Sequence, residues 1–286
     1  MTPELAAGLP AHVVDEVIER ALDEDLGAAG DVTTAATIAA SAFTSADLVS
    51  RVDGVVAGLP VAARVFETVS QGRVRFEFGT ADGARITKGE VLATVRGPVR
   101  DLLTAERTAL NLLCHLSGVA TLTRRWVDAV AGTGAHIRDT RKTLPGLRVL
   151  EKYAVRMGGG VNHRMSLSDA ALVKDNHVAA AGGVVPAFER VRAAYPGLPL
   201  EVEADTVAQA REVIDAGAEL VLLDNMAPDD LRTVVAYAAG RCRLEASGGL
   251  VLDTARTVAE TGVDYLAVGA LTHSAPGLDI GLDLQP

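Results

Sequence analysis

The sequence has few aromatic residues, few cysteines and no surplus of basic charge. Phe, Trp and Tyr together make up 3% of its 286 residues, so it offers few flat faces on which nucleic-acid bases can stack. Its formal net charge is −10, opposite in sign to that of typical proteins that bind a phosphate backbone. We therefore expect no nucleic-acid partner.

Cysteines and long apolar runs are also scarce. Cys114 and Cys242 each lie in an apolar stretch, and two such residues make neither a disulfide framework nor a metal motif. We expect both to be small core residues. No stretch approaches the roughly 18 uncharged apolar residues of a membrane span, and the N-terminus lacks the basic and apolar regions of a signal peptide. We expect a cytoplasmic protein with no membrane partner.

The first part of the chain has the pattern of a mixed α and β domain. Apolar spacing predicts a helix over 12–26, and alternation predicts strands over 45–58 and 74–78. A further short strand ends near Gly97-Pro98. A long helical stretch over about 101–131 either ends this domain or joins it to the next.

After this helix, short apolar strands alternate with helical stretches, which predicts a parallel sheet. The expected strands lie near 135–139, 170–173, 198–202, 219–223, 242–246 and 263–268. They run into Thr140-Arg141-Lys142, Lys174, Glu203, Asp224, Ser247-Gly248-Gly249 and Gly269-Ala270. In a (β/α) barrel the active site lies at the C-terminal strand ends, so this succession predicts a site there.

The available length sets the kind of barrel. A complete barrel has eight strands in about 250 residues, whereas this region has room for about six or seven. We expect an α/β protein with an open, incomplete, TIM-like α/β barrel whose gap is covered by the first domain. The segment 278–284 alternates apolar and polar residues, which predicts a strand that returns to the N-terminal domain.

Basic residues are concentrated between Arg138 and Lys174, where eight of them face only three acids. This focusing favours an anionic small ligand. The 3–4 residue spacing of three of them predicts a solvated helix face: Arg148, Lys152 and Arg156. Strand ends or a glycine-rich loop hold four more of them together with His163: Arg141, Lys142, Arg164 and Lys174. Since arginine pairs bidentately with carboxylates, this group suits a dicarboxylate.

Two acids and two glycine-containing loops complete the predicted site. Glu203 and Asp224 end adjacent strands, where they suit Mg²⁺ or stabilise a cationic transition state; capping of the following helices is the alternative. The loops at 247–249 and 269–270 suit phosphate binding. Arg107 follows Glu106 in an apolar helix, where a surface ion pair is the plain interpretation. These residues predict an enzyme that brings a phosphorylated ligand and a carboxylate ligand together, without naming the reaction.

Two stretches resemble the most specific motifs of the quinolinate phosphoribosyltransferase family: residues 139–148 (DTRKTLPGLR) and 158–164 (GGGVNHR). Further stretches follow in the family's order: 167–169, 174–177, 201–203, 223–226, 246–249 and 268–274. In the first domain, 24–33 and 106–111 are also similar. The resemblance covers nearly the whole chain.

The resemblance implies an N-terminal α/β sandwich domain, here 1–116 with 276–286 returning to it, and an open barrel over 117–275. It implies a homodimer or an assembly of dimers with shared active sites, in which Arg107 reaches the partner's site. Arg51 is a second candidate for this sharing. The implied reaction joins quinolinate to phosphoribosyl pyrophosphate with Mg²⁺, and yields nicotinate mononucleotide, pyrophosphate and CO₂.

The resemblance also assigns residues. Quinolinate would bind Arg107, Thr140, Arg141, Lys142, His163, Arg164 and Lys174. Phosphoribosyl pyrophosphate would bind Arg51, Lys142, Lys174, Glu203, Asp224, Ser247, Gly248, Gly249, Gly269, Ala270 and His273. Catalytic roles would fall to Lys142, Glu203 and Asp224. Mg²⁺ would bind Glu203 and Asp224, directly or through water and pyrophosphate.

Three other functions compete with this one. Lys174 at a barrel strand end suits a Schiff-base aldolase, although the neighbouring His163 and Arg164 favour a carboxylate partner. A related phosphoribosyltransferase would use nicotinate or a non-pyridine acceptor, although the basic surplus favours a dicarboxylate. A non-enzymatic anion-binding or transport-accessory protein is the third, and Glu203 and Asp224 argue against it because they repel anions.

Overall fold

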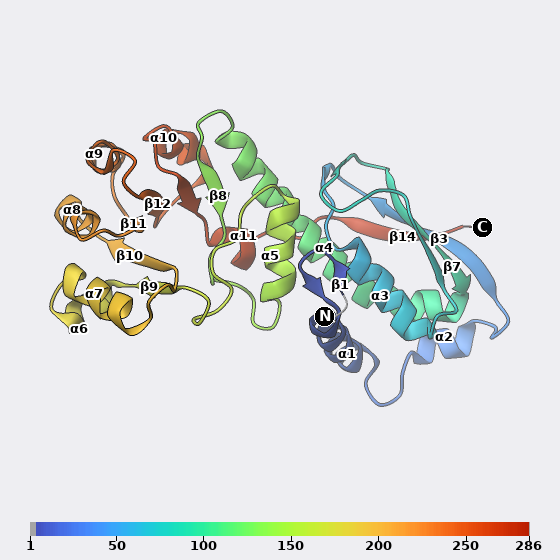
Figure 1. Cartoon of the computed structure of the whole chain (residues 1–286). Helices are drawn as coiled ribbons and strands as arrows, with labels where there is room; N and C mark the ends of the chain where they lie inside the picture. The colour runs from blue at the N-terminus through green and yellow to red at the C-terminus, as the bar shows by residue number, and fades with distance from the viewer. Residues whose placement is uncertain (1–3, 286) are drawn as a thin grey trace. The chain divides into compact units, whose positions relative to one another are not determined.

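The computed structural model describes residues 4–285, which form two compact units (Figure 1). The N-terminal unit extends to Arg124 and also contains Thr143–Gly159 and the chain from Leu271 onward. The barrel unit comprises Arg125–Lys142 and Gly160–Ala270. These units differ from the predicted ranges 1–116 and 117–275, and both divisions fall within the helix α4 (Val99–Ala129).

A four-stranded antiparallel sheet organises the N-terminal unit, in the order β14-β3-β7-β5. The strands are β3 (Phe43–Ser50), β5 (Arg75–Phe78), β7 (Val91–Pro98) and β14 (Ile280–Leu284). Ala46 lies opposite Val95 and Leu48 opposite Ala93, and all four are fully buried, because alternate residues of a strand point to the same face. The expected C-terminal strand is present as β14 and pairs with β3.

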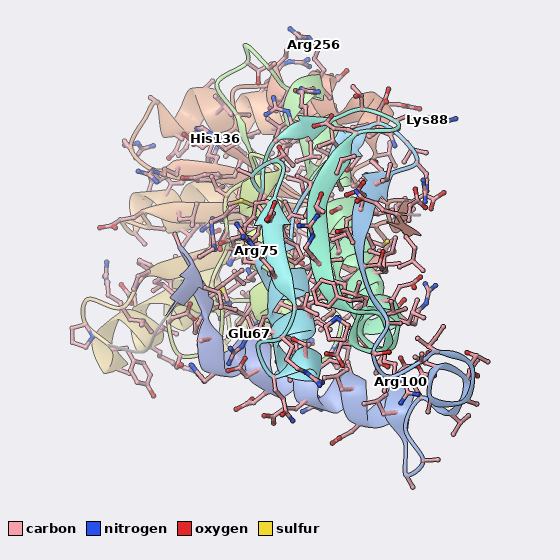
Figure 2. All side chains as sticks on the ribbon, turned by 90° about the vertical axis from the view of Figure 1, so that its right-hand side faces the viewer. Glu67, Arg75, Lys88, Arg100, His136 and Arg256 are labelled. Atoms are coloured by element: carbon pink, nitrogen blue, oxygen red, sulfur yellow. The ribbon has the colours of Figure 1, made fainter. Side chains whose placement is uncertain are left out.

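Short strands and helices surround this sheet. They are β1 (Glu4–Ala6), β2 (Leu9–Pro10), α1 (Ala11–Leu26), α2 (Val32–Thr37), β4 (Gly54–Val55), α3 (Leu59–Ser70), β6 (Arg85–Ile86) and α5 (Arg148–Met157). The predicted strand 45–58 is thus two strands, β3 and β4. The Asp31 side chain caps α2 by accepting from the Thr34 N–H. Arg100, which is labelled in Figure 2, donates to the Ile38 carbonyl at the other end of this helix.

Helix α5 overturns one expectation about the basic residues. The side chain of Lys152 was predicted on a solvated face, but it is fully buried. Every residue from Leu150 to Val155 is buried, so α5 is a core helix of its unit rather than a surface helix with one wet face. Its Glu151 carboxylate accepts from the Leu144 N–H at 3.1 Å and lies 2.9 Å from His115 Nε2.

The barrel unit contains a parallel sheet of six strands in the order β8-β13-β12-β11-β10-β9. They are β8 (His136–Arg138), β9 (Ala171–Val173), β10 (Leu200–Ala204), β11 (Leu220–Asp224), β12 (Arg243–Ser247) and β13 (Tyr265–Ala267). β8 and β9 are its two edges, so the barrel is open, as predicted. An isolated parallel bridge joins Arg138 to Val161 beside β8.

Helices cover the outer side of these strands (Figure 1). They are α6 (Asp175–Ala181), α7 (Val184–Ala194), α8 (Val207–Asp215), α9 (Pro228–Ala238), the 3-10 turn η1 (Leu252–Thr254) and α10 (Ala255–Ala259). A short helix, α11 (Ala270–His273), follows β13. Cys114 and Cys242 are half-buried, and burial raises the pKa of both thiols. Within residues 4–285, no helix has the length and apolar character needed to cross a membrane.

Candidate active site

A cavity of about 660 Å³ opens at the C-terminal ends of the barrel strands. This position follows from the parallel topology, which brings all the strand ends to one edge. Eleven of the predicted site residues line it: Thr140, Arg141, Lys142, His163, Arg164, Lys174, Glu203, Asp224, Ser247, Gly248 and Gly249. The sheet therefore collects residues spread over more than a hundred positions of sequence into one site.

Six lining residues were not predicted: Leu172, Asp175, Leu222, Asn225, Glu245 and Ala267. The two-residue period of a strand could have predicted three of them from the sequence. Leu172, Leu222 and Glu245 each precede a predicted strand-end residue by two positions, so they point to the same face. Leu172, Leu222 and Ala267 add apolar surface to a charged cavity, which suits a flat ring with charged substituents.

Glu203 is already engaged within the protein. Its side chain is 6% exposed, and its Oε2 lies 2.5 Å from Nζ of Lys174. Its Oε1 accepts from the Asp175 N–H at 3.2 Å. Lys174 therefore joins the basic and acidic sides of the cavity, and an anionic ligand that binds Lys174 competes with Glu203 for its charge.

Three carboxylates form a group that fits a divalent cation. One oxygen each of Glu203, Asp205 and Asp224 lies within 4.8 Å of the others. Burial, followed by the charges of Glu203 and Asp224, raises the pKa of Asp205, so negative charge is concentrated here. Hard oxygen ligands of this kind suit Mg²⁺. Asp205 was missed in the sequence because it follows its strand rather than ending it.

The loops after β11 and β12 interlock. Gly248 has φ +85°, and a Cβ there would lie 2.3 Å from Oδ1 and 2.8 Å from the backbone nitrogen of Asn225. The Asn225 N–H donates to the Ser247 carbonyl at 2.9 Å, and its side-chain amide donates to Asp224 at 2.6 Å. Only glycine satisfies both the backbone angle and this close approach. Gly269 follows β13 and does not line the cavity.

Two arginines lie close together on the basic side. Burial, followed by the charge of Arg141, lowers the pKa of the Arg164 guanidinium. Nη1 of Arg164 donates to the Ala170 carbonyl at 2.8 Å. Nε of Arg141 is buried and has no hydrogen-bond partner among the described residues. An anion between these groups relieves their repulsion and satisfies unused donors.

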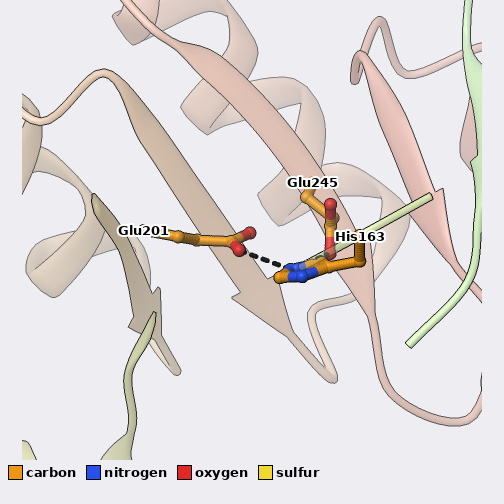
Figure 3. A group of neighbouring side chains, drawn as sticks. All are labelled: His163, Glu201 and Glu245. Atoms are coloured by element: carbon orange, nitrogen blue, oxygen red, sulfur yellow. Dashed lines mark hydrogen bonds and ion pairs between the residues drawn. The ribbon is translucent and has the colours of Figure 1, made fainter. Parts of the chain in front are cut away.

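Beneath the basic side lies a buried cluster of His163, Glu201 and Glu245 (Figure 3). Nε2 of His163 lies 2.6 Å from Oε2 of Glu201 and 3.7 Å from Oε1 of Glu245. Arg138 donates to Oε2 of Glu245 at 2.7 Å. Burial raises the pKa of both carboxyls to about 7. Strand periodicity again explains the placement, because Glu201 and Glu245 precede Glu203 and Ser247 by two residues.

Three other predicted site residues belong to the N-terminal unit. Arg107 is exposed on α4. Arg51 forms a bidentate ion pair with Asp283, with a shortest distance of 2.6 Å. Nδ1 of His273 lies 2.6 Å from Oγ of Ser274. The cavity described above is lined by the barrel unit, so the roles of Arg51, Arg107 and His273 stay predictions, as does that of Ala270.

Two domain models describe the chain. The model for the quinolinate phosphoribosyl transferase N-terminal domain matches residues 31–117, and that for the C-terminal domain matches residues 119–283. The two matches meet within α4 and together cover most of the sequence.

Individual relatives agree with these models. A nicotinate-nucleotide pyrophosphorylase [carboxylating] of Mycobacterium leprae is 54% identical over 94% of this chain and 96% of its own length. A probable enzyme of the same name from Bacillus subtilis is 42% identical over 91% of this chain and 90% of its own. The solved nicotinate-nucleotide pyrophosphorylase of Francisella tularensis is 34% identical, with a TM-score of 0.93 over the full length of both chains. With both domains matched and the strand-end residues gathered in one cavity, this chain belongs to the quinolinate phosphoribosyltransferase family.

Proposed function

We propose that the cavity transfers a phosphoribosyl group from phosphoribosyl pyrophosphate to the ring nitrogen of quinolinate, with loss of CO₂. The products are nicotinate mononucleotide and pyrophosphate. The observation that carries this proposal is a single cavity with basic groups on one side and Glu203 and Asp224 on the other, with Asp205 beside these two acids. The names of the closely similar relatives, carboxylating nicotinate-nucleotide pyrophosphorylases, support it.

The basic side suits the dicarboxylate. Arg141 and Arg164 offer planar donor pairs that match carboxylate geometry, and Lys174 adds a third cation. Leu172 and Leu222 line the same cavity and suit the faces of the pyridine ring. Binding at two carboxylates fixes the ring in two directions, so its nitrogen is held in line with the ribose carbon that it attacks.

The acidic side suits the ribose. As pyrophosphate departs, positive charge develops at C1 of the ribose, and the fixed carboxylates of Glu203 and Asp224 stabilise it. Ser247, Gly248 and Gly249 supply backbone N–H groups for the 5′-phosphate. We propose that Glu203, Asp205 and Asp224 hold Mg²⁺, which would neutralise charge on the leaving pyrophosphate.

Decarboxylation follows from the new bond. Once the ring nitrogen carries the ribose it is positively charged, and the ring withdraws electrons from the adjacent carbon. The bond between that carbon and its carboxylate then breaks, CO₂ leaves, and the electron pair stays on the ring carbon until a proton takes the vacated position.

We further propose a homodimer in which Arg107 completes the partner's site. Its exposure on α4 supports this role, because a surface residue is accessible to a second copy. Sedimentation of the chain, together with restored activity on mixing Arg107→Ala with a cavity variant such as Asp224→Ala, would test it. Sharing predicts that mixed dimers regain one intact site, whereas activity confined to single chains predicts no recovery.

The function is tested with purified protein, quinolinate, phosphoribosyl pyrophosphate and Mg²⁺, following CO₂ and nicotinate mononucleotide together. We expect equal amounts of both products, and none when nicotinate replaces quinolinate. Absence of product from folded protein would overturn the proposal. Borohydride trapping with carbonyl substrates separates the aldolase alternative, since only a Schiff base at Lys174 would be reduced to a stable adduct.

A further inference from the structure

Helix α5 lies between the two stretches that carry most of the predicted quinolinate ligands. Residues 139–148 lead into it, and residues 158–164 follow it. Every residue from Leu150 to Val155 is buried, so the helix is firmly packed where both loops leave it. The loop before it contains Arg141 and Lys142, which line the cavity. The contacts that hold this loop therefore bear on where these two cations lie.

A tight turn joins the loop to α5. The N–H of Leu147 donates to the Leu144 carbonyl at 3.1 Å. Gly146 has a φ of +82°, as the third residue of a type II turn requires. The turn begins two residues after Lys142, so its position restricts the backbone that carries this lysine.

Glu151 fixes the turn to the buried part of the N-terminal unit. Its side chain is fully buried, and its Oε2 accepts from the Leu144 N–H at 3.1 Å. Its Oε1 lies 2.9 Å from Nε2 of His115 on α4. Both oxygens are thus engaged, one by the turn and one by a second helix. Arg148 adds a further tie, because its Nε donates to Oγ1 of Thr143 at 3.1 Å.

Stability alone does not account for a buried carboxylate at this position. A buried ion pair commonly contributes no more to stability than apolar side chains of similar volume. Glu151 supplies an acceptor for a loop N–H, which an apolar residue cannot do. Lys142 is exposed, and ordering its long side chain on a ligand costs conformational entropy. A fixed backbone beside it lowers the total cost of binding.

We propose that Glu151 is a positioning residue for Lys142, because it holds the turn that follows this lysine and so keeps the ammonium group at the cavity for quinolinate. Glu151 acts through the Leu144 N–H and not on the substrate itself. The proposal rests on the function proposed above. It leaves the predicted quinolinate ligands, His163 included, as they are.

Hydrogen exchange tests the positioning in the absence of substrate. In Glu151→Leu the Leu144 N–H loses its acceptor, so we expect the amides of residues 143–147 to exchange at least about tenfold faster, with no change in the barrel strands. Glu151→Gln retains an oxygen for this N–H and should stay within about threefold of the native protein. Tyr153→Phe is the matched control, because it removes the buried hydrogen bond of α5 to Asp82, at 2.7 Å, without touching the loop. Equal acceleration in the Leu and Gln variants, or none in either, would refute the proposal.

A double-mutant cycle tests whether Glu151 acts through Lys142. In calorimetric titrations, Glu151→Leu should weaken quinolinate binding about tenfold, a change of about 1.4 kcal/mol. In a Lys142→Ala background the same substitution should weaken binding less than about twofold, because the residue that it positions is gone. In an Arg164→Ala background the loss should still be about tenfold. Equal losses in all three backgrounds would indicate a general structural effect and overturn the proposal.

Folding and the proposed function are controlled separately. If Glu151→Leu does not fold, Thr143→Val replaces it in the cycle, since it removes only the tie from Arg148; we expect about a threefold loss of quinolinate affinity that again disappears in the Lys142→Ala background. A loss that persists in that background would contradict the proposal. A native protein that binds no quinolinate would count against the proposed function, and the exchange comparison would still decide whether Glu151 holds the loop.

Discussion

Glu203→Gln should make quinolinate bind more tightly in the absence of phosphoribosyl pyrophosphate. In the free protein, Nζ of Lys174 lies 2.5 Å from the Glu203 carboxylate. A quinolinate carboxylate that binds Lys174 competes with the Glu203 carboxylate for its positive charge. Gln removes the negative charge but keeps an oxygen for the Asp175 N–H, so the loop after β9 keeps its backbone contact.

The expected size follows from the exposure of the two partners. The Lys174 side chain is 49% exposed and that of Glu203 6%. A hydrogen bond to a charged group contributes about 1.5–3 kcal/mol when buried, whereas exposed ion pairs contribute up to about 1 kcal/mol. With one partner half in water, we take about 1 kcal/mol, which corresponds to an approximately fivefold lower Kd for quinolinate.

Calorimetric titration of quinolinate into the protein measures this change. Asp224→Asn is the matched control, because it removes one negative charge from the same cavity without touching the Lys174 ion pair. We expect less than about a twofold change in the control, since water screens the remaining interaction. An unchanged or weaker affinity in Glu203→Gln, or an equal gain in the control, would refute the reasoning. Turnover of Glu203→Gln should fall in either case, because the carboxylate facing the ribose is lost.

Three further changes probe the rest of the barrel site. Gly248→Ala places a Cβ 2.3 Å from Asn225 Oδ1, so it should raise the KM for phosphoribosyl pyrophosphate about tenfold or more; an unchanged KM would contradict the interlocked loops. Asp205→Asn should raise the Mg²⁺ concentration for half-maximal activity several-fold, and an unaltered Mg²⁺ response would remove Asp205 from the proposed metal site. Burial raises the pKa of Glu245 from 4.5 to about 7, so its protonated form favours folding below about pH 4.5 and this contribution is lost as pH rises through 7. Between about pH 5 and 8, the Tm of Glu245→Gln should therefore fall less than the Tm of the native protein. An identical change in Tm for both proteins would contradict this prediction.

The sequence located the strands and the residues at their ends. Alternation and strand length depend on neighbours along the chain, so the six barrel strands were predicted within a few residues of their observed bounds. The adjacency of Glu203 and Asp224 also followed, because consecutive strands of a parallel α/β sheet are commonly neighbours. Thus most of the residues that line the cavity could be predicted from the sequence, and the two-residue period would have added Leu172, Leu222 and Glu245.

Tertiary structure decided what these side chains touch. Lys152 has the spacing of a surface residue, yet its helix is buried on every side, because other parts of the chain pack around it. The pairing of Lys174 with Glu203 joins residues 29 positions apart, and the ring of His163 contacts the carboxylate of Glu201 and a backbone N–H. Such contacts are set by inter-strand register and loop conformation, which are properties of the packed sheet and not of any local segment. The sequence by itself determined most of the residues that line the cavity, and only the folded sheet decided which of them are paired and which are fixed in place.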